Sequence, residues 1–123
     1  MDCDKTHLET NKKPLTFDEY ADFAKRNAVY PGFGQGSVYP LLGLCGETGE
    51  VAEAWKKMVR DKGGKIDLEF LATIKKELGD VLWYLWALGH ELGFSLEDIA
   101  NTNIRKLLDR KDRGTIHGSG NDR

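Results

Sequence analysis

Two segments of the chain, residues 40–60 and 67–92, each combine an apolar helical stripe with two acidic residues. On a helical wheel, the apolar side chains of the first segment fall within an arc of about 140°. In each segment one acid lies inside the stripe and a second, one turn further on, lies at its margin. A carboxylate turned toward an apolar interior destabilises the fold unless a partner compensates its charge, so these acids limit what the chain can fold into. They are Glu47 and Glu50 in the first segment and Glu77 and Asp80 in the second.

The two acid pairs repeat each other, because position 47 corresponds to position 77 and position 50 to position 80. The short connection from Arg60 to Asp67 favours antiparallel packing of the two helices, which brings both pairs toward the middle of the helix pair. Their mutual repulsion would then raise some of their pKa values. A divalent cation removes this conflict, and ligands made of oxygen alone suit the hard ions Mg²⁺ and Mn²⁺.

The acids are also compatible with arrangements that need no Mg²⁺ or Mn²⁺. A di-iron bundle places a histidine three residues after a glutamate, but Glu50 and Asp80 occupy those positions, which disfavours a di-iron site. The acids could instead form salt bridges, or lie exposed at the edge of a helix bundle. The lysines in reach of such bridges are Lys56, Lys57, Lys75 and Lys76.

The rest of the chain also has a helical pattern. Thr16 with Glu19, and Ser95 with Asp98, have the spacing of helix-capping boxes. The proline- and glycine-rich residues 31–37 predict a loop. We therefore predict an all-α, four-helix bundle-like fold with helices at about residues 17–30, 40–60, 67–92 and 95–111.

The length of 123 residues suits a single domain. Residues 1–15 are polar and without a period, and residues 114–123 are polar and rich in glycine. We expect a flexible N-terminal arm over 1–15, a helical domain over 16–113 and a flexible C-terminal tail over 114–123.

Charge and hydropathy exclude several classes of protein. The net charge of -2 lacks the basic surface of a general nucleic-acid binder. No apolar stretch approaches the roughly 20 residues of a membrane span, and the N-terminus lacks the apolar core of a secretion signal. The two cysteines do not form a disulfide framework. We expect a cytoplasmic protein that binds neither nucleic acid nor a membrane.

The sequence around the four acids resembles the MazG-like family of all-α nucleoside triphosphate pyrophosphohydrolases. That family carries E-x-x-E on one helix and E-x-x-D on the next. The corresponding segments here are GETGEVAE at 46–53 and ELGDVLWY at 77–84, and NIRKLLDR at 103–110 resembles the family's third region. The resemblance covers about residues 17–113.

The resemblance implies Mg²⁺-dependent hydrolysis between the α and β phosphates of a nucleoside triphosphate, which releases a nucleoside monophosphate and pyrophosphate and controls nucleotide pools. Mn²⁺ is a possible substitute for Mg²⁺. Gly46 stands where many members have a further glutamate, so the general base and the number of metal ions stay open. The implied metal ligands are Glu47, Glu50, Glu77 and Asp80, of which Glu47 and Glu50 are also the catalytic candidates.

An anionic substrate needs hydrogen-bond donors as well as metal ions. Asn103, Lys106 and Arg110, in the last predicted helix, are the substrate-binding candidates, with solvated surface positions as the alternative.

Trp83 and Trp86 lie outside the stripe of Glu77, so the helix that carries them is apolar nearly all round. We expect a second copy to cover them in a homodimer or a dimer-of-dimers tetramer, with stacking on a nucleobase as the alternative.

Two rival functions remain. The first is a non-catalytic helical binding module whose buried carboxylates are structural. The second is an enzyme that hydrolyses a diphosphate or a non-nucleotide pyrophosphate at the same metal site.

Overall fold

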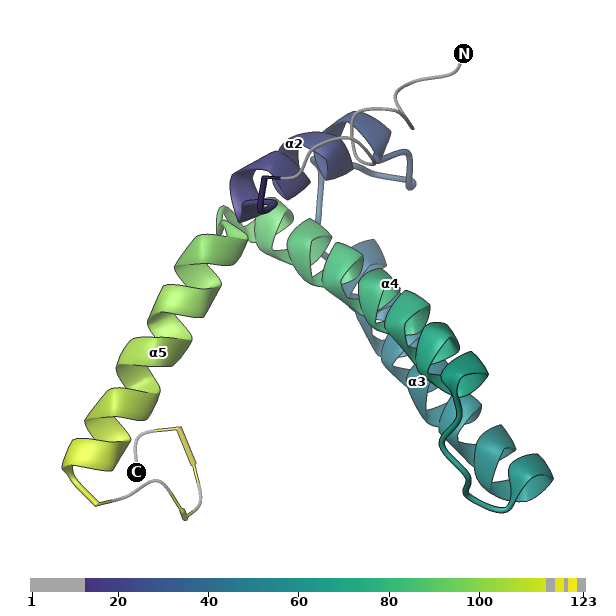
Figure 1. The fold of residues 1–123 in the computed structure, drawn as a ribbon. Coiled ribbons are helices and arrows are strands. Elements are labelled where there is room, and N and C mark those ends of the chain that lie inside the picture. Colours follow the sequence, from purple (N-terminus) through teal and green to yellow (C-terminus); the bar gives the residue numbers. More distant parts are fainter. Residues whose placement is uncertain (1–12, 115–116, 119, 122–123) are drawn as a thin grey trace.

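The computed structural model describes residues 13–114, 117–118 and 120–121. Its described part is all helical and contains no strand, which confirms the predicted all-α class (Figure 1). None of these helices has the length and hydropathy that a membrane span needs. Most of the proposed N-terminal arm and about half of the proposed C-terminal tail lie outside the described residues. The helices are α2 (Phe17–Asn27), α3 (Val38–Lys62), α4 (Leu68–Leu92) and α5 (Leu96–Asp112).

Local sequence signals set most helix ends. The Thr16 side chain accepts the Glu19 N–H at 3.2 Å at the start of α2, and the Asp67 side chain accepts the Phe70 N–H at 2.8 Å at the start of α4. The start of α5 has a complete capping box formed by Ser95 and Asp98. These side chains satisfy backbone donors that have no partner within the helix.

Two helix ends differ from the prediction. Helix α2 ends at Asn27 rather than near Tyr30, because Ala28 is already extended and Tyr30 packs its ring into the core. Helix α3 begins at Val38, two residues before Pro40. A proline is tolerated in the first turn, where its missing N–H would have no helical partner.

The four helices form two legs that meet at a corner (Figure 1). Helices α3 and α4 run side by side as an antiparallel hairpin in one leg, and α5 forms the other. Lys62 supports the turn of the hairpin, with Nζ 3.2 Å from Asp67 Oδ2 and 3.0 Å from Glu69 Oε2. Helix α2 packs across the corner against both α4 and α5. Helices α3 and α5 make no direct contact in the described chain.

The main core lies at this corner, not along the legs. Trp86 is 4% exposed and packs with residues of α2 and α5 of its own chain. The expectation that a second copy covers Trp86 is therefore wrong, because α2 already supplies the second layer at this end of α4. Trp83 is half-buried and packs edge-on against Tyr30, with ring centroids 5.9 Å apart. The buried core residues are Ala24, Tyr30, Trp86, Ala87 and Leu96.

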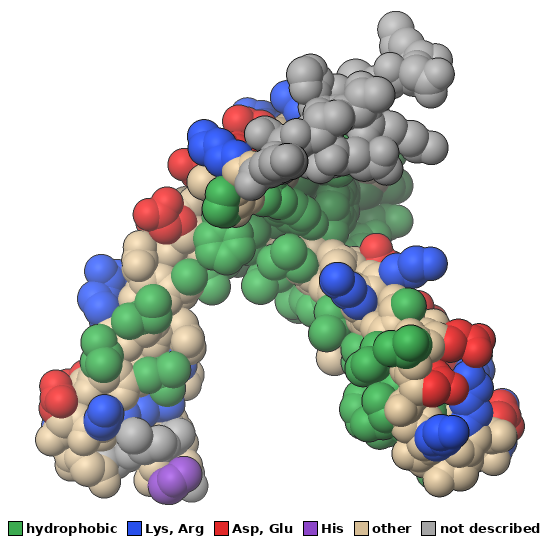
Figure 2. Space-filling model, viewed as in Figure 1, with side chains coloured by type: hydrophobic (Ala, Val, Ile, Leu, Met, Phe, Trp, Pro, Cys, Tyr) green, Lys and Arg blue, Asp and Glu red, His purple; other side chains and the backbone are tan. Residues whose placement is uncertain are grey.

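Both legs leave large apolar side chains exposed. Figure 2 shows apolar side chains over the corner and along both legs. Such surface is more than scattered single residues, and contiguous apolar surface of this kind is typical of interaction sites and ligand-binding grooves. The exposed apolar residues of the legs include Leu42, Trp55, Val59, Leu71 and Leu78 on the hairpin and Ile104, Leu107 and Leu108 on α5.

Candidate metal centre

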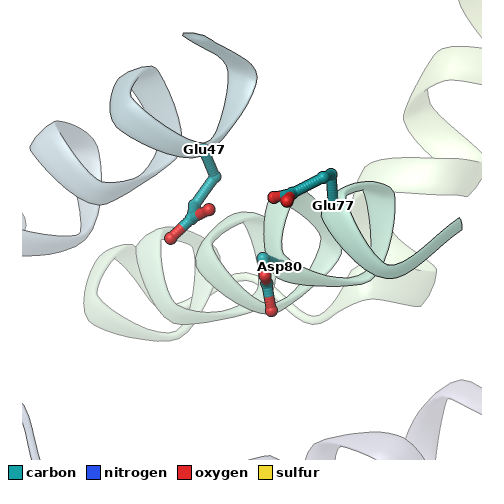
Figure 3. A group of neighbouring side chains, drawn as sticks. All are labelled: Glu47, Glu77 and Asp80. Atoms are coloured by element: carbon teal, nitrogen blue, oxygen red, sulfur yellow. The ribbon is translucent and has the colours of Figure 1, made fainter. Parts of the chain in front are cut away.

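Three of the four predicted acids come together halfway along the α3–α4 hairpin. One carboxylate oxygen from each of Glu47, Glu77 and Asp80 lies within 4.8 Å of the other two. Figure 3 shows Glu47 extending from α3 toward α4, where Glu77 and Asp80 lie one turn apart. Glu47 and Glu77 are half-buried and Asp80 is exposed. The arrangement offers a cluster of oxygen ligands with one side open to solvent.

The spacing of the acids and the direction of the helices produce this cluster. Residues three apart on a helix share a face, so Glu77 and Asp80 project from α4 as neighbours. Because α3 runs antiparallel to α4, Glu47 reaches both of them, and Glu50 lies further toward the turn of the hairpin. Glu50 is exposed and is not among the three clustered acids. With Glu77 it lines a groove of about 320 Å³ between the two helices, next to the cluster.

The clustered acids form no ion pair with a basic side chain in the part of the chain that the structure describes. None of the ion pairs found among the described residues includes Glu47, Glu77 or Asp80. Lys56 instead pairs with Glu53 at 2.8 Å. The geometry therefore does not support salt bridges as the reason for the cluster.

Burial raises the pKa of Glu47 above its usual value, and the nearby charges of Asp80, Glu77 and Glu50 raise this pKa further. The charged form of Glu47 is thus disfavoured in the folded protein as long as no cation is bound. A cation held between the acids would reverse that preference.

Replacing Glu47 by glutamine is expected to stabilise the metal-free protein at neutral pH. The stability linked to protonation of Glu47 is fully present below the unfolded pKa and is lost as the pH rises through the raised folded pKa. The Tm of Glu47→Gln should therefore exceed that of wild type at neutral pH, and the difference should shrink as the pH falls toward about 4.3. Thermal unfolding in EDTA across this range measures it. A lower Tm for the variant at neutral pH would contradict the expectation.

Two tyrosines lie near the cluster, and the sequence did not single out either of them as a site residue. Burial raises the pKa of Tyr84, and Tyr39, Glu47 and Asp80 add to the effect. Burial and Asp80 likewise raise the pKa of Tyr20, on α2. Both hydroxyls therefore stay protonated at neutral pH.

Gly43 gives Tyr84 its place against α3. A Cβ atom at Gly43 would overlap the Tyr84 ring, so only glycine allows this close approach. The sequence signal for this contact was Gly43 itself, because a glycine inside a helix can mark a close approach by a neighbouring side chain.

Comparison with known proteins agrees with the cluster. A family model, the MazG nucleotide pyrophosphohydrolase domain, matches residues 36–115, well over half of the chain. The chain belongs to the MazG nucleotide pyrophosphohydrolase family. It is similar to the Gene 37 protein of Mycobacterium phage L5, at 43% identity over 111 residues that cover 86% of this chain and 97% of the phage protein. No solved structure matches the chain.

Membership of the MazG family confirms the predicted enzyme class, a hydrolase that acts on phosphoric anhydride bonds. The family is typically metal-dependent, which agrees with a cluster of acids from α3 and α4. The MazG match includes α3, α4 and α5, and so every candidate site residue.

The candidates on α5 lie apart from the acids within one chain. Asn103 and Lys106 are exposed and line a pocket of about 430 Å³ with Phe94 and Ile99. Helix α5 forms the leg apart from the α3–α4 hairpin and does not contact α3 in the described chain, so the structure does not bring these donors to the cluster (Figure 1).

Arg110 occupies a different environment from the other two candidates. It is 5% exposed, and its Nη2 donates to the carbonyl oxygens of Gly120 at 3.3 Å and Asn121 at 2.9 Å. The guanidinium thereby holds part of the C-terminal segment against the end of α5. Its role toward a substrate stays a prediction.

Proposed function

We propose that this protein is a Mg²⁺-dependent nucleoside triphosphate pyrophosphohydrolase that cleaves between the α and β phosphates and releases a nucleoside monophosphate and pyrophosphate. The observation that carries the proposal is the convergence of Glu47, Glu77 and Asp80 within 4.8 Å. An all-oxygen, acidic donor set that has no ion pair with the described basic side chains fits Mg²⁺, with Mn²⁺ as a substitute. Glu47, Glu77 and Asp80 would hold the ion, with Glu50 as the fourth ligand.

When bound, Mg²⁺ would neutralise phosphate charge and lower the pKa of a water molecule. The chain itself supplies position and charge. The half-buried Glu47 and Glu77 would hold the ion, and the exposed Asp80 would leave one side of the site accessible to the polyphosphate. Glu50 lies one turn from Glu47 and is exposed, so it would bind the ion through one carboxylate oxygen and could accept a proton from the attacking water at the other.

Substrate binding in this proposal needs a second copy of the chain. In a homodimer, or a dimer-of-dimers tetramer, α5 of one protomer would lie beside the acids of its partner and offer Asn103 and Lys106 to the phosphates. The support for this is the separation of α5 from α3 and the exposed apolar residues on both legs. Arg110 would contribute by holding the C-terminal segment. The helical domain of residues 16–113 would be the unit that associates.

The proposed substrates, nucleoside triphosphates, suggest the cellular compartment in which the enzyme acts. We propose that the enzyme works in the cytoplasm and controls the nucleotide pool there.

The direct test is pyrophosphate release from a panel of ribo- and deoxyribonucleoside triphosphates, with Mg²⁺, with Mn²⁺ and with EDTA. A nucleoside diphosphate and a non-nucleotide pyrophosphate belong in the same panel, because turnover of these alone would favour the rival substrate class. Absence of turnover by folded protein with every compound would contradict the proposal.

Mg²⁺ is expected to raise the Tm of the wild-type protein. A ligand that binds only the folded state adds about 2.7 kcal/mol to the unfolding free energy at 100 times its Kd. The increase should be absent in Asp80→Asn, which removes one charged ligand. Differential scanning calorimetry over a series of Mg²⁺ concentrations measures it. A wild-type Tm that does not respond to Mg²⁺ would favour the non-catalytic binding module.

A further inference from the structure

Glu91, near the C-terminal end of α4, is a carboxylate outside the metal centre that accepts two hydrogen bonds at one oxygen. Its Oε1 accepts the Tyr30 hydroxyl at 2.6 Å and the Gly34 N–H at 2.7 Å. The Tyr30 hydroxyl, followed by the N–H groups of Gly34 and Gly36, lowers the pKa of Glu91. A carboxylate at this end of a helix meets the unfavourable end of the helix dipole, and these donors offset that effect.

These hydrogen bonds fix the loop between α2 and α3 to the end of α4. The loop has little regular structure of its own. Gly32 and Gly34 have positive φ, and the backbone hydrogen bonds described within the loop close two short turns. The Phe33 ring stacks on His90, with centroids 5.5 Å apart and an interplanar angle of 7°. Glu91 supplies the polar part of the attachment.

A chain of aromatic contacts leads from Glu91 to the acid cluster. The Tyr30 ring, held by Glu91, stacks on Tyr39 in the first turn of α3, with centroids 5.4 Å apart and an interplanar angle of 5°. The Tyr30 ring also packs edge-on against Trp83, with centroids 5.9 Å apart, and the Trp83 ring packs edge-on against Tyr84, with centroids 5.1 Å apart. The Tyr84 ring in turn rests against Gly43 of α3. The charges that act on Tyr84 include those of Glu47 and Asp80.

We propose that Glu91 is a positioning residue of the metal centre: by holding Tyr30 it fixes Trp83, and through Trp83 it fixes the Tyr84 ring against Gly43, one turn before Glu47. Glu91 and Tyr84 lie two turns apart on α4, and the path of side-chain contacts between them runs through Tyr30, in the loop, and Trp83. The catalytic consequence rests on the proposed function, whereas the coupling between the two residues does not.

The coupling is tested by NMR on protein labelled with ¹³Cζ-tyrosine, because the chain has only four tyrosines. Single Tyr→Phe variants assign the signals. Glu91→Ala and Tyr30→Phe should both shift the Tyr84 resonance, and Gly43→Ala, whose new methyl group overlaps the ring, is the positive control. Glu97→Gln, an exposed acid on α5, is the control that should leave it unchanged. If Glu91→Ala does not fold, Tyr30→Phe decides. An unshifted Tyr84 resonance in the folded variant overturns the proposal.

The catalytic consequence is read from kcat and KM separately. Misplacement of a site group by about 1 Å can cost up to a hundredfold in rate, so we expect Glu91→Ala to lower kcat by roughly tenfold or more with little change in KM. Glu91→Gln keeps an oxygen that accepts from Tyr30 and Gly34, and should recover most of kcat. If Glu91 only stabilises the fold, its substitution by alanine should lower the Tm and leave kcat unchanged. If wild-type protein hydrolyses no nucleotide, the proposed function fails, and the Tyr84 resonance still decides the coupling.

Discussion

Glu77→Gln and Asp80→Asn are expected to lower kcat for nucleoside triphosphate hydrolysis by about a thousandfold, the scale seen when one electrostatic contact to a transition state is removed. Each variant keeps the size of its side chain and removes one charge from the cluster that also contains Glu47. With the ligand charge reduced, the site would hold its cation weakly and stabilise phosphate charge poorly. Pyrophosphate release at saturating nucleotide and Mg²⁺ measures the loss.

Thermal stability separates this loss from unfolding. Each substitution relieves repulsion within the cluster, so the metal-free variants should be at least as stable as wild type. Glu97→Gln makes the same chemical change at an exposed position on α5 and should keep full activity. Full activity of Glu77→Gln would show that the cluster is not the metal centre.

Local signals predicted the helices well because the interactions that define their ends are local. Thr16, Asp67 and Ser95 each accept a backbone N–H three residues further on, so the sequence contains the whole interaction. The end of α2 was missed because Tyr30 turns into a core made by α4 and α5, which no pattern within α2 contains.

The acid cluster was predictable only in part. Apolar periodicity placed the acids on the facing sides of two helices. The correspondence of positions 47 and 50 with positions 77 and 80 is a repeat in the sequence, and it does not say which acids meet in the folded chain. The antiparallel direction of the hairpin decides that Glu47 meets both Glu77 and Asp80, with Glu50 nearer the turn. Tyr84 was missed because its position depends on Gly43, a residue on the opposite helix.

The apolar pattern of α4 indicated that more than one side of this helix is covered. The pattern does not say whether the same chain or a second copy covers it. Helix α2 of the same chain covers Trp86 at the corner. The middle of the hairpin keeps exposed apolar residues such as Leu71 and Leu78, each 52% exposed. Helix α5 has a matching exposed apolar face. Association of two copies through these faces therefore stays a prediction that solution experiments decide.

Leu107→Glu, on the exposed apolar face of α5, is expected to separate the oligomer and remove at least about 99% of the activity. Leu107 is 46% exposed, so the new charge should not disturb the fold of one chain, but an oligomer interface would have to bury it unpaired. Light scattering after size exclusion gives the oligomeric state, and pyrophosphate release gives the activity. Asn101→Glu adds the same charge at an exposed polar position of α5 and should change neither.

Complementation tests whether the second copy completes the site. Glu77→Gln and Lys106→Ala would each be inactive alone if the acids come from one protomer and the phosphate donor from its partner. In a mixed dimer, the acids of the Lys106→Ala chain face an unaltered α5 of the Glu77→Gln chain, which makes one of the two sites complete. Random pairing after co-expression should therefore restore about one quarter of wild-type activity. If each chain formed its own site, every site would carry one of the two defects and co-expression would restore nothing, so recovery of activity separates a shared site from a self-contained one.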